Sequence, residues 1–456
     1  MQPFTMRRTL LFSLAVAAYS AAADPSYFRD VRPILQRVCQ GCHQPALKSG
    51  NLDLTTFEGL ATGGKRGPSF APGNPEASIL VKYLTGELKP QMPLGQPPLP
   101  AEQIAMFRDW IRAGAKDDTP AAARETITPD KPIEYQRPPV ITALAFSPDG
   151  KHLAVSGYRE TLIHTADGSS LVKRLPGLSE RIQGIAWSSD GKLLVVSGGT
   201  PARFGEVQFW DFAAGKLLHS TTLTNDTVFG GALSPDGRRV AVGGADYTVR
   251  ILDAATGQEL HRLASHENWV LATVFGVDGK RLVSVGRDRA AKLTDVQAGQ
   301  FLENINLLRG ELAALARHPA RDIVVIGGED RIPYIYAMDR PRNMKIADDS
   351  TLLRKLDRQN GAILALAWSP DGKYIAVGGA APEVTLYDAD SGVLKASLKG
   401  HSAGIYALAF SPDSSTLATG GFDGQVRLYR IPAGELIKAF VPVPLSPSLS
   451  SIRSQP

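Results

Sequence analysis

One sequence unit recurs from Val140 onward, and it limits the fold more than any other feature of the chain. Each copy opens with an alternating apolar strand and a turn of the S-P-D-G type, as in "ITALAFSPDG", "ILALAWSPDG" and "IYALAFSPDS". The turn aspartates are Asp149, Asp190, Asp236, Asp278, Asp371 and Asp413. Several of their spacings are 41 or 42 residues. A repeat of this length predicts four-stranded blades arranged in an all-β propeller.

The number of copies predicts the size of the ring. Seven first strands and seven fourth strands can be counted, the last of them in "ELIKAFVPV". We therefore expect seven complete blades over residues 140–441, while "KPIEYQ" before the first blade competes for the closing position. The second copy carries a longer connection, "GGTPARFGEVQFWD", and the fifth a basic turn with Arg340, Arg342 and Lys345. Both are interpreted as surface loops, which either tolerate insertion or bind a partner.

Short motifs inside the copies resemble the WD-repeat family. The motif position is occupied by Trp210-Asp211, Leu252-Asp253, Thr294-Asp295 and Tyr387-Asp388. Two copies also carry a histidine, a hydroxyl residue and an aspartate at matching positions: His266, Ser284 and Asp288, then His401, Thr419 and Asp423. The resemblance implies that each set forms a buried hydrogen-bond network that stabilises its blade.

These sets also permit a catalytic interpretation. Serine, histidine and aspartate also compose hydrolytic triads. Their recurrence in two copies favours bracing, because repeat scaffolds reuse the same interactions. The repeats show no His or Cys cluster with metal-ligand spacing. We assign no catalytic residue, and an enzyme with its own substrate is the less favoured class.

The N-terminus has the layout of a secretory signal. Arg7 and Arg8 precede the apolar run "TLLFSLAVAAYSA", and three alanines then offer a cleavage site before Asp24. The alternative is a membrane anchor, but the run is shorter than the roughly 20 residues that span a bilayer. The sequence predicts a signal peptide over residues 1–23, a periplasmic or otherwise exported protein, and no transmembrane anchor after cleavage.

The charge balance gives little support for nucleic-acid binding. The formal net charge of +5 falls to +3 when Arg7 and Arg8 leave with the signal peptide. Nucleic-acid binding requires basic residues clustered on one face. We therefore expect protein partners and no nucleic acid.

The segment "RVCQGCHQP" holds the only two cysteines, Cys39 and Cys42, followed directly by His43. C-x-x-C-H is the attachment signature of c-type haem, in which two thiols form thioethers with the porphyrin and the histidine ligates iron. A redox C-x-x-C would be expected within a βαβ unit. A structural zinc site needs four ligands, and residues 24–130 contain no further Cys or His. The motif predicts one covalently attached haem c.

The second iron ligand is expected to be a methionine, because no other histidine precedes His152. Met92 lies between prolines in "LKPQMPLGQPPLP", and prolines stiffen a loop. Met106 lies in an apparent helix, "PAEQIAMFRDWIRAG", where packing is the simpler role. We expect Met92 as the distal ligand, since Met/His ligation raises a haem potential. The alternative is an open or water-bound iron.

Three short helices are expected around the motif, within residues 27–43, 74–84 and 101–113. Asn74 is expected to cap the second helix. Phe28 and Trp110 are expected to pack between the first helix and the last. Residues 27–115 resemble the planctomycete-type cytochrome c domain through "VRPILQRVCQGCH", "SGNLDLTTFEGLATGG", "PGNPEASILVKYL" and "QMPLGQPPLPAEQIAMFRDWIRAGA". The resemblance implies haem c with His43 as proximal and Met92 as distal ligand. The family usually has two prolines after that methionine, whereas Leu94 follows Pro93 here.

The resulting prediction is a multidomain chain with a small all-α cytochrome c domain and an all-β seven-bladed WD-type propeller. Its parts are a signal peptide (1–23), the cytochrome c domain (24–116), a linker (117–139), the propeller (140–441) and a disordered tail (442–456). The expected function is single-electron transfer, with the propeller as docking platform for redox partner proteins in the periplasm. Two alternatives remain: an envelope interaction or scaffold protein with a structural haem, and an oxidoreductase in which the haem feeds chemistry on the propeller.

Overall fold

The structure is a computed structural model, and it describes residues 24–44, 47–120, 133–338 and 349–446. The predicted signal peptide and the basic turn with Arg340, Arg342 and Lys345 lie outside the described residues. Within the described ranges, no helix is both long enough and apolar enough to cross a membrane.

The N-terminal region is helical. It comprises η1 (Tyr27–Val31), α1 (Arg32–Val38), the hairpin β1 (His43–Gln44) and β2 (Leu47–Lys48), η2 (Ser49–Asn51), α2 (Phe57–Thr62), α3 (Ile79–Thr85) and α4 (Ala101–Arg112). Thr56 begins α2 because its hydroxyl accepts a hydrogen bond from Gly59 N–H at 3.0 Å. The predicted second helix begins at Ile79 and not at Asn74, whose side chain instead accepts from Ala77 N–H in a turn.

Aromatic side chains form the core of this helical region. Tyr27 and Trp110 are each 1% exposed, and their ring centroids lie 5.7 Å apart. Phe57 packs edge-on against Tyr27 at 5.0 Å. The expectation that Phe28 packs on Trp110 is wrong, because Phe28 is only half-buried and Tyr27 is the residue of this segment that turns inward.

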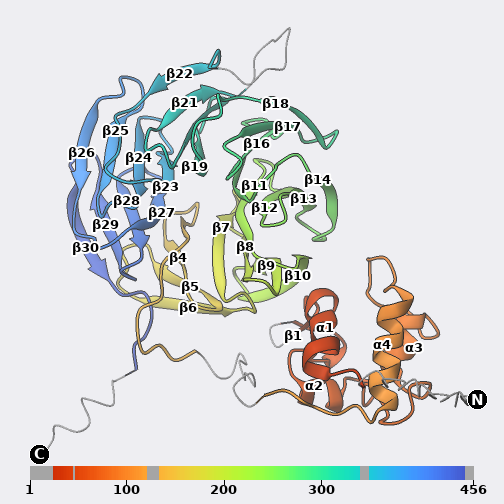
Figure 1. The fold of residues 1–456 in the computed structure, drawn as a ribbon. Helices are drawn as coiled ribbons and strands as arrows, with labels where there is room; N and C mark the ends of the chain where they lie inside the picture. Colours follow the sequence, from red (N-terminus) through yellow and green to blue (C-terminus); the bar gives the residue numbers. More distant parts are fainter. Residues whose placement is uncertain (1–23, 45–46, 121–132, 339–348, 447–456) are drawn as a thin grey trace, which may run out of the picture.

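The remainder of the described chain forms seven four-stranded antiparallel sheets (Figure 1). Blades one to four contain β3 (Leu144–Phe146), β4 (His152–Ser156), β5 (Glu160–Thr165) and β6 (Leu171–Pro176); β7 (Arg181–Trp187), β8 (Leu193–Thr200), β9 (Phe204–Asp211) and β10 (Lys216–Thr224); β11 (Val228–Leu233), β12 (Arg239–Gly244), β13 (Val249–Asp253) and β14 (Glu259–Leu263); and β15 (Val270–Phe275), β16 (Arg281–Gly286), β17 (Ala291–Asp295) and β18 (Gln300–Asn304). Blades five to seven contain β19 (Leu312–Arg317), β20 (Ile323–Gly328), β21 (Tyr334–Ala337) and β22 (Leu352–Lys355); β23 (Ile363–Trp368), β24 (Tyr374–Gly379), β25 (Val384–Asp388) and β26 (Leu394–Leu398); and β27 (Ile405–Phe410), β28 (Thr416–Gly421), β29 (Val426–Arg430) and β30 (Glu435–Phe440).

The ring closes between blades one and seven without a borrowed strand, as predicted. Ile141 N–H donates to Gly421 O at 3.0 Å across the closure. In "KPIEYQ", Tyr135 forms only an isolated bridge to Leu445. The Tyr135 ring is 5% exposed and packs in the core shared by the two blades. The segment therefore packs across the junction between blades one and seven and adds no strand to either blade.

Two predicted boundaries differ from the structure. The long connection of the second blade is a hairpin extension, since β8 and β9 each run for eight residues and only residues 201–203 lie between them. The predicted tail is ordered at its start, because Val443 is 5% exposed and Ser446 N–H donates to Tyr135 O at 2.9 Å. The tail from residue 447 onward lies outside the described residues.

Candidate functional site

The C-x-x-C-H segment forms a tight turn at the end of α1. Cys39 follows the last helical residue, and its N–H still donates to Leu35 O at 2.9 Å. The Cys39 carbonyl then accepts from Cys42 N–H at 3.3 Å and from His43 N–H at 3.2 Å. The backbone therefore holds both cysteines and the histidine within one turn.

Both cysteines are free thiols, with Cys39 half-buried and Cys42 exposed. Burial raises the pKa of Cys39 to about 12, with a further rise from Cys42 and an opposing effect of Arg37. Burial also raises the pKa of Cys42. A redox-active cysteine would have a lowered pKa, so this environment does not favour the dithiol alternative.

The ring of His43 is oriented by a backbone carbonyl. Its Nδ1 lies 2.9 Å from Ser49 O, and because a carbonyl only accepts, Nδ1 carries the proton. This leaves the lone pair on Nε2, for which the described residues provide no hydrogen-bond partner. Burial lowers the pKa of His43, although the Ser49 hydrogen bond opposes the shift. A neutral imidazole with one oriented nitrogen is the form that ligates a metal.

Met92 lies in the loop after α3, where its N–H donates to Tyr83 O at 3.1 Å. Its half-buried side chain packs against the hydrophobic cluster of the helical region, which Cys39 also contacts. Met106 packs against the same cluster from α4, the helix predicted for it. Both methionines are therefore associated with this cluster.

The donor set of these residues suits a haem better than a protein-only metal site. Across the described ranges, no group of three or more His, Cys, Asp or Glu side chains is arranged to hold a metal ion. A haem iron needs no such group, because the porphyrin occupies the equatorial positions and the chain supplies only axial ligands. An imidazole nitrogen and a thioether sulfur are a standard axial pair.

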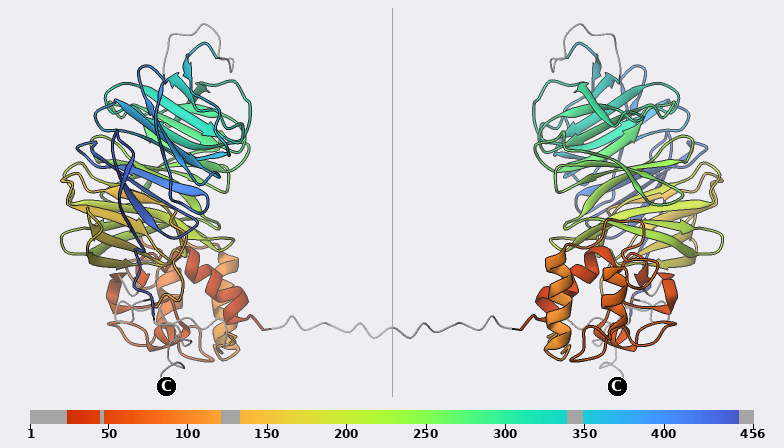
Figure 2. Two further views of the ribbon diagram at one scale, coloured as in Figure 1. Left: turned by 90° about the vertical axis from the view of Figure 1, so that its left-hand side faces the viewer. Right: turned by 90° about the vertical axis from the view of Figure 1, so that its right-hand side faces the viewer.

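The predicted haem turn lies against the second propeller blade. Figures 1 and 2 show the helical region beside one edge of the propeller, next to β10. A Cβ added to Gly41 would lie 2.5 Å from Ser220 O in β10. Leu47 packs against the apolar cluster that contains Trp210 and Leu217. The turn and the hairpin after it thus contact the propeller, a contact that the sequence did not predict.

The histidine sets of the propeller form the predicted hydrogen-bond networks. His266 Nδ1 lies 2.9 Å from an Asp288 carboxylate oxygen, and its Nε2 lies 2.7 Å from Ser284 Oγ. His401 makes the same contacts with Asp423 and Thr419, at 3.0 and 2.7 Å. Ser284 is 1% exposed and Thr419 is 0% exposed, so neither hydroxyl is open to a substrate. The bracing interpretation is confirmed.

Comparisons with protein families agree with the propeller. Residues 135–164, 215–253, 257–295 and 392–430 match the family model "WD domain, G-beta repeat". Residues 318–406 match "Anaphase-promoting complex subunit 4 WD40 domain". The chain thus contains a seven-bladed propeller built from WD40 repeats. Residues 39–94 match "Planctomycete cytochrome C", a range that begins at Cys39 and includes Met92.

Two of three similar individual proteins are named as WD repeat-containing. The chain is 40% identical over 81 residues to an uncharacterized WD repeat-containing protein of Schizosaccharomyces pombe, covering 17% of this chain and 12% of the relative. It is 31% identical over 137 residues to the human U3 small nucleolar RNA-associated protein 4 homolog, covering 27% of this chain and 19% of the relative. It is 28% identical over 114 residues to an uncharacterized WD repeat-containing protein of Synechocystis, covering 24% and 32%. The matches span at most about a third of each relative.

Proposed function

We propose that this protein is an exported monohaem c-type cytochrome that transfers single electrons, with its propeller as the docking platform for a partner protein. The observation that carries the proposal is the Cys39–Cys42–His43 turn, in which Ser49 O engages Nδ1 and leaves Nε2 of His43 available. The match of residues 39–94 to a cytochrome family model supports it.

Each residue of the site has a distinct role in this proposal. Cys39 and Cys42 would tether one haem c, and His43 and Met92 would be its axial ligands. The haem, when bound, supplies a one-electron Fe(III)/Fe(II) couple. The Ser49 carbonyl fixes the orientation of the His43 ring, and the Met92 N–H bond to Tyr83 O holds the loop that carries the distal sulfur.

The location and the partner are part of the same proposal. The basic, apolar and small-residue layout of residues 1–23 supports export to the periplasm. WD-type propellers present loops on a rigid scaffold, which suits protein recognition. A structural haem in an envelope scaffold and a haem-fed oxidoreductase are the competing functions. Reduction by a periplasmic donor at a useful rate argues against the first, and a polar reaction centre on the propeller is required for the second.

Voltammetry of the purified exported protein tests the function. We expect one reversible one-electron couple, and a visible spectrum with the methionine-to-iron charge-transfer band in the far red. Met92→Ala removes that band and lowers the midpoint potential by on the order of 100 mV, because axial methionine raises the potential. Met106→Ala is the matched control, since Met106 packs against the same cluster from α4.

Each result has a defined meaning. Absence of covalent haem or of a reversible couple in the wild-type protein contradicts the electron-transfer function. A charge-transfer band that persists in Met92→Ala and disappears in Met106→Ala contradicts the distal-ligand assignment but leaves the function standing.

A further inference from the structure

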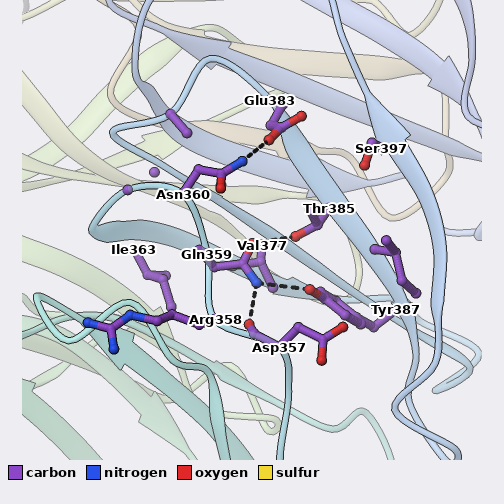
Figure 3. Close-up of a pocket in the computed structure, with 15 residues that line it drawn as sticks. Asp357, Arg358, Gln359, Asn360, Ile363, Val377, Glu383, Thr385, Tyr387 and Ser397 are labelled. Carbon is purple, nitrogen blue, oxygen red and sulfur yellow. Dashed lines mark hydrogen bonds between the residues drawn. The ribbon is translucent and has the colours of Figure 1, made fainter.

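The sixth blade contains a cavity of about 210 Å³, lined by both polar and apolar residues, that the proposed haem chemistry does not use (Figure 3). It lies between the connection that leads into β23 and the strands β24, β25 and β26. Gln359 forms part of its wall, where the carboxamide accepts from Thr385 Oγ1 at 2.7 Å and donates to the Tyr387 hydroxyl at 2.9 Å.

In three other blades, an ion pair fills the position that is equivalent to this cavity. There an aspartate follows the second strand, and a basic residue four positions later pairs with it. The pairs are Asp246 with Arg250 at 2.6 Å, Asp288 with Lys292 at 3.6 Å and Asp423 with Arg427 at 2.8 Å. These basic residues are only 2%, 8% and 7% exposed. Each of these three blades thus buries a long cationic side chain of its own at this position.

The sixth blade lacks both members of the pair. Ile363 pairs with Gly379 as Ile405 pairs with Gly421 in the seventh blade, which fixes the register between the two. By that register, Ala381 and Thr385 occupy the positions of the aspartate and the basic residue. Both replacements are short, so the volume that the ion pair fills elsewhere remains as the cavity.

The lining of the cavity also gains two carboxylates. Glu383 and Asp357 both line it, and the equivalent residues of the seventh blade are Gln425 and Lys399. Glu383 accepts a hydrogen bond from Asn360 Nδ2 at 2.6 Å and retains acceptor capacity. Among the described residues that line the cavity, Arg358 is the one cation, and Figure 3 shows its guanidinium directed away from the group of Gln359 and Tyr387.

We propose that this cavity binds an arginine or lysine side chain presented by a partner protein. Its volume is below the roughly 300 Å³ at which sites for drug-sized ligands begin, so it suits one side chain. It lies at the position where three other blades bury Arg250, Lys292 and Arg427. Two carboxylates, those of Glu383 and Asp357, line it and would pair with a cation. The inference rests on the docking role proposed for the propeller, and it is independent of the haem.

Isothermal titration of the full-length protein with N-acetyl-arginine amide tests the inference. We expect N-acetyl-arginine amide to bind saturably. The citrulline analogue, which is similar in shape but uncharged, should bind at least tenfold more weakly. The double variant Ala381→Asp/Thr385→Arg rebuilds the sister-blade pair and fills the cavity. It should retain the melting temperature and bind arginine amide at least tenfold more weakly. Glu383→Gln, which keeps the shape, should weaken binding severalfold.

Three outcomes overturn the inference: no saturable binding to the wild-type protein, equal binding of the citrulline analogue, or undiminished binding to the folded double variant. The haem couple of the same samples is recorded in parallel. A normal couple without arginine binding rejects the cavity site alone, and arginine binding without a couple rejects the electron-transfer function alone.

Discussion

At the scale of single residues, His401 links the stability of the propeller to pH. Its imidazole is held between the Asp423 carboxylate and the Thr419 hydroxyl, and Arg427 also lies 2.8 Å from Nδ1. Burial lowers the pKa of His401, and Arg427 lowers it further, while Asp423 opposes the shift. The folded state therefore binds a proton at His401 more weakly than the unfolded state does.

This environment predicts that His401 destabilises the fold on acidification. Below the ordinary histidine value of about 6.5, the unfolded chain takes up the proton first, so the free energy of unfolding falls as pH falls. His401→Gln removes this contribution and keeps a polar side chain, as Gln359 does in the sixth blade. Between pH 7 and pH 5, wild type should lose more unfolding free energy than the variant, by up to about 2 kcal/mol, since one group contributes at most about 1.4 kcal/mol per pH unit.

Urea unfolding at a series of pH values measures this difference. If the free energy of unfolding changes with pH in the same way for wild type and His401→Gln, His401 is not the residue that links stability to pH. A steeper loss in the variant contradicts the sign of the pKa shift.

At the scale of elements, the regular repeats and the three helices α1, α3 and α4 were predictable, whereas α2 and the extended hairpin of blade two were not. The blades follow from strand alternation and from turns in which, for example, Ser147 Oγ donates to Asp149 at 2.6 Å. The six residues of α2 lie in a glycine-rich segment, and only the Thr56 cap signals them. The extended hairpin of blade two reads as a loop because glycines occur on both sides of its turn.

The sequence assigns the candidate site only where a motif itself carries the chemistry, and the haem assignment stays a prediction. Cys39, Cys42 and His43 are assigned from residue type and spacing, and Met92 from the prolines beside it and the lack of a second histidine. Ser49 as the partner of His43 does not, because that contact depends on the hairpin between them. The cavity in blade six could have been found by aligning the copies, where Ala381 replaces an aspartate. The shape of the cavity does not follow from such an alignment, because it depends on how the surrounding side chains pack.

At the scale of the whole molecule, the contact between the predicted haem turn and blade two connects the helical region to the propeller. Gly41 is buried against β10, and its φ lies outside the left-handed region, so its own backbone accepts alanine. The added methyl group would overlap Ser220 O, which belongs to the backbone and cannot rotate away. Steric overlap in a packed contact costs roughly 1–3 kcal/mol.

Gly41→Ala should therefore loosen the helical region from the propeller and leave each of them folded. Small-angle X-ray scattering is expected to show a larger radius of gyration, with circular dichroism unchanged. Gly404→Ala is the matched control, because its nearest contact, Gly379 O at 3.3 Å, lies within the propeller. Identical scattering from wild type and Gly41→Ala means that the turn does not depend on this contact for its position.

The proposed function depends above all on one covalent haem, attached to Cys39 and Cys42 in the exported protein. The most direct measurement is the intact mass of the denatured protein, purified from the periplasm of a host that matures c-type cytochromes. We expect a chain that begins at Asp24 and carries the added mass of one haem, and a Cys39→Ser/Cys42→Ser variant without that addition. A wild-type protein with the mass of the bare polypeptide would rule out the covalent haem.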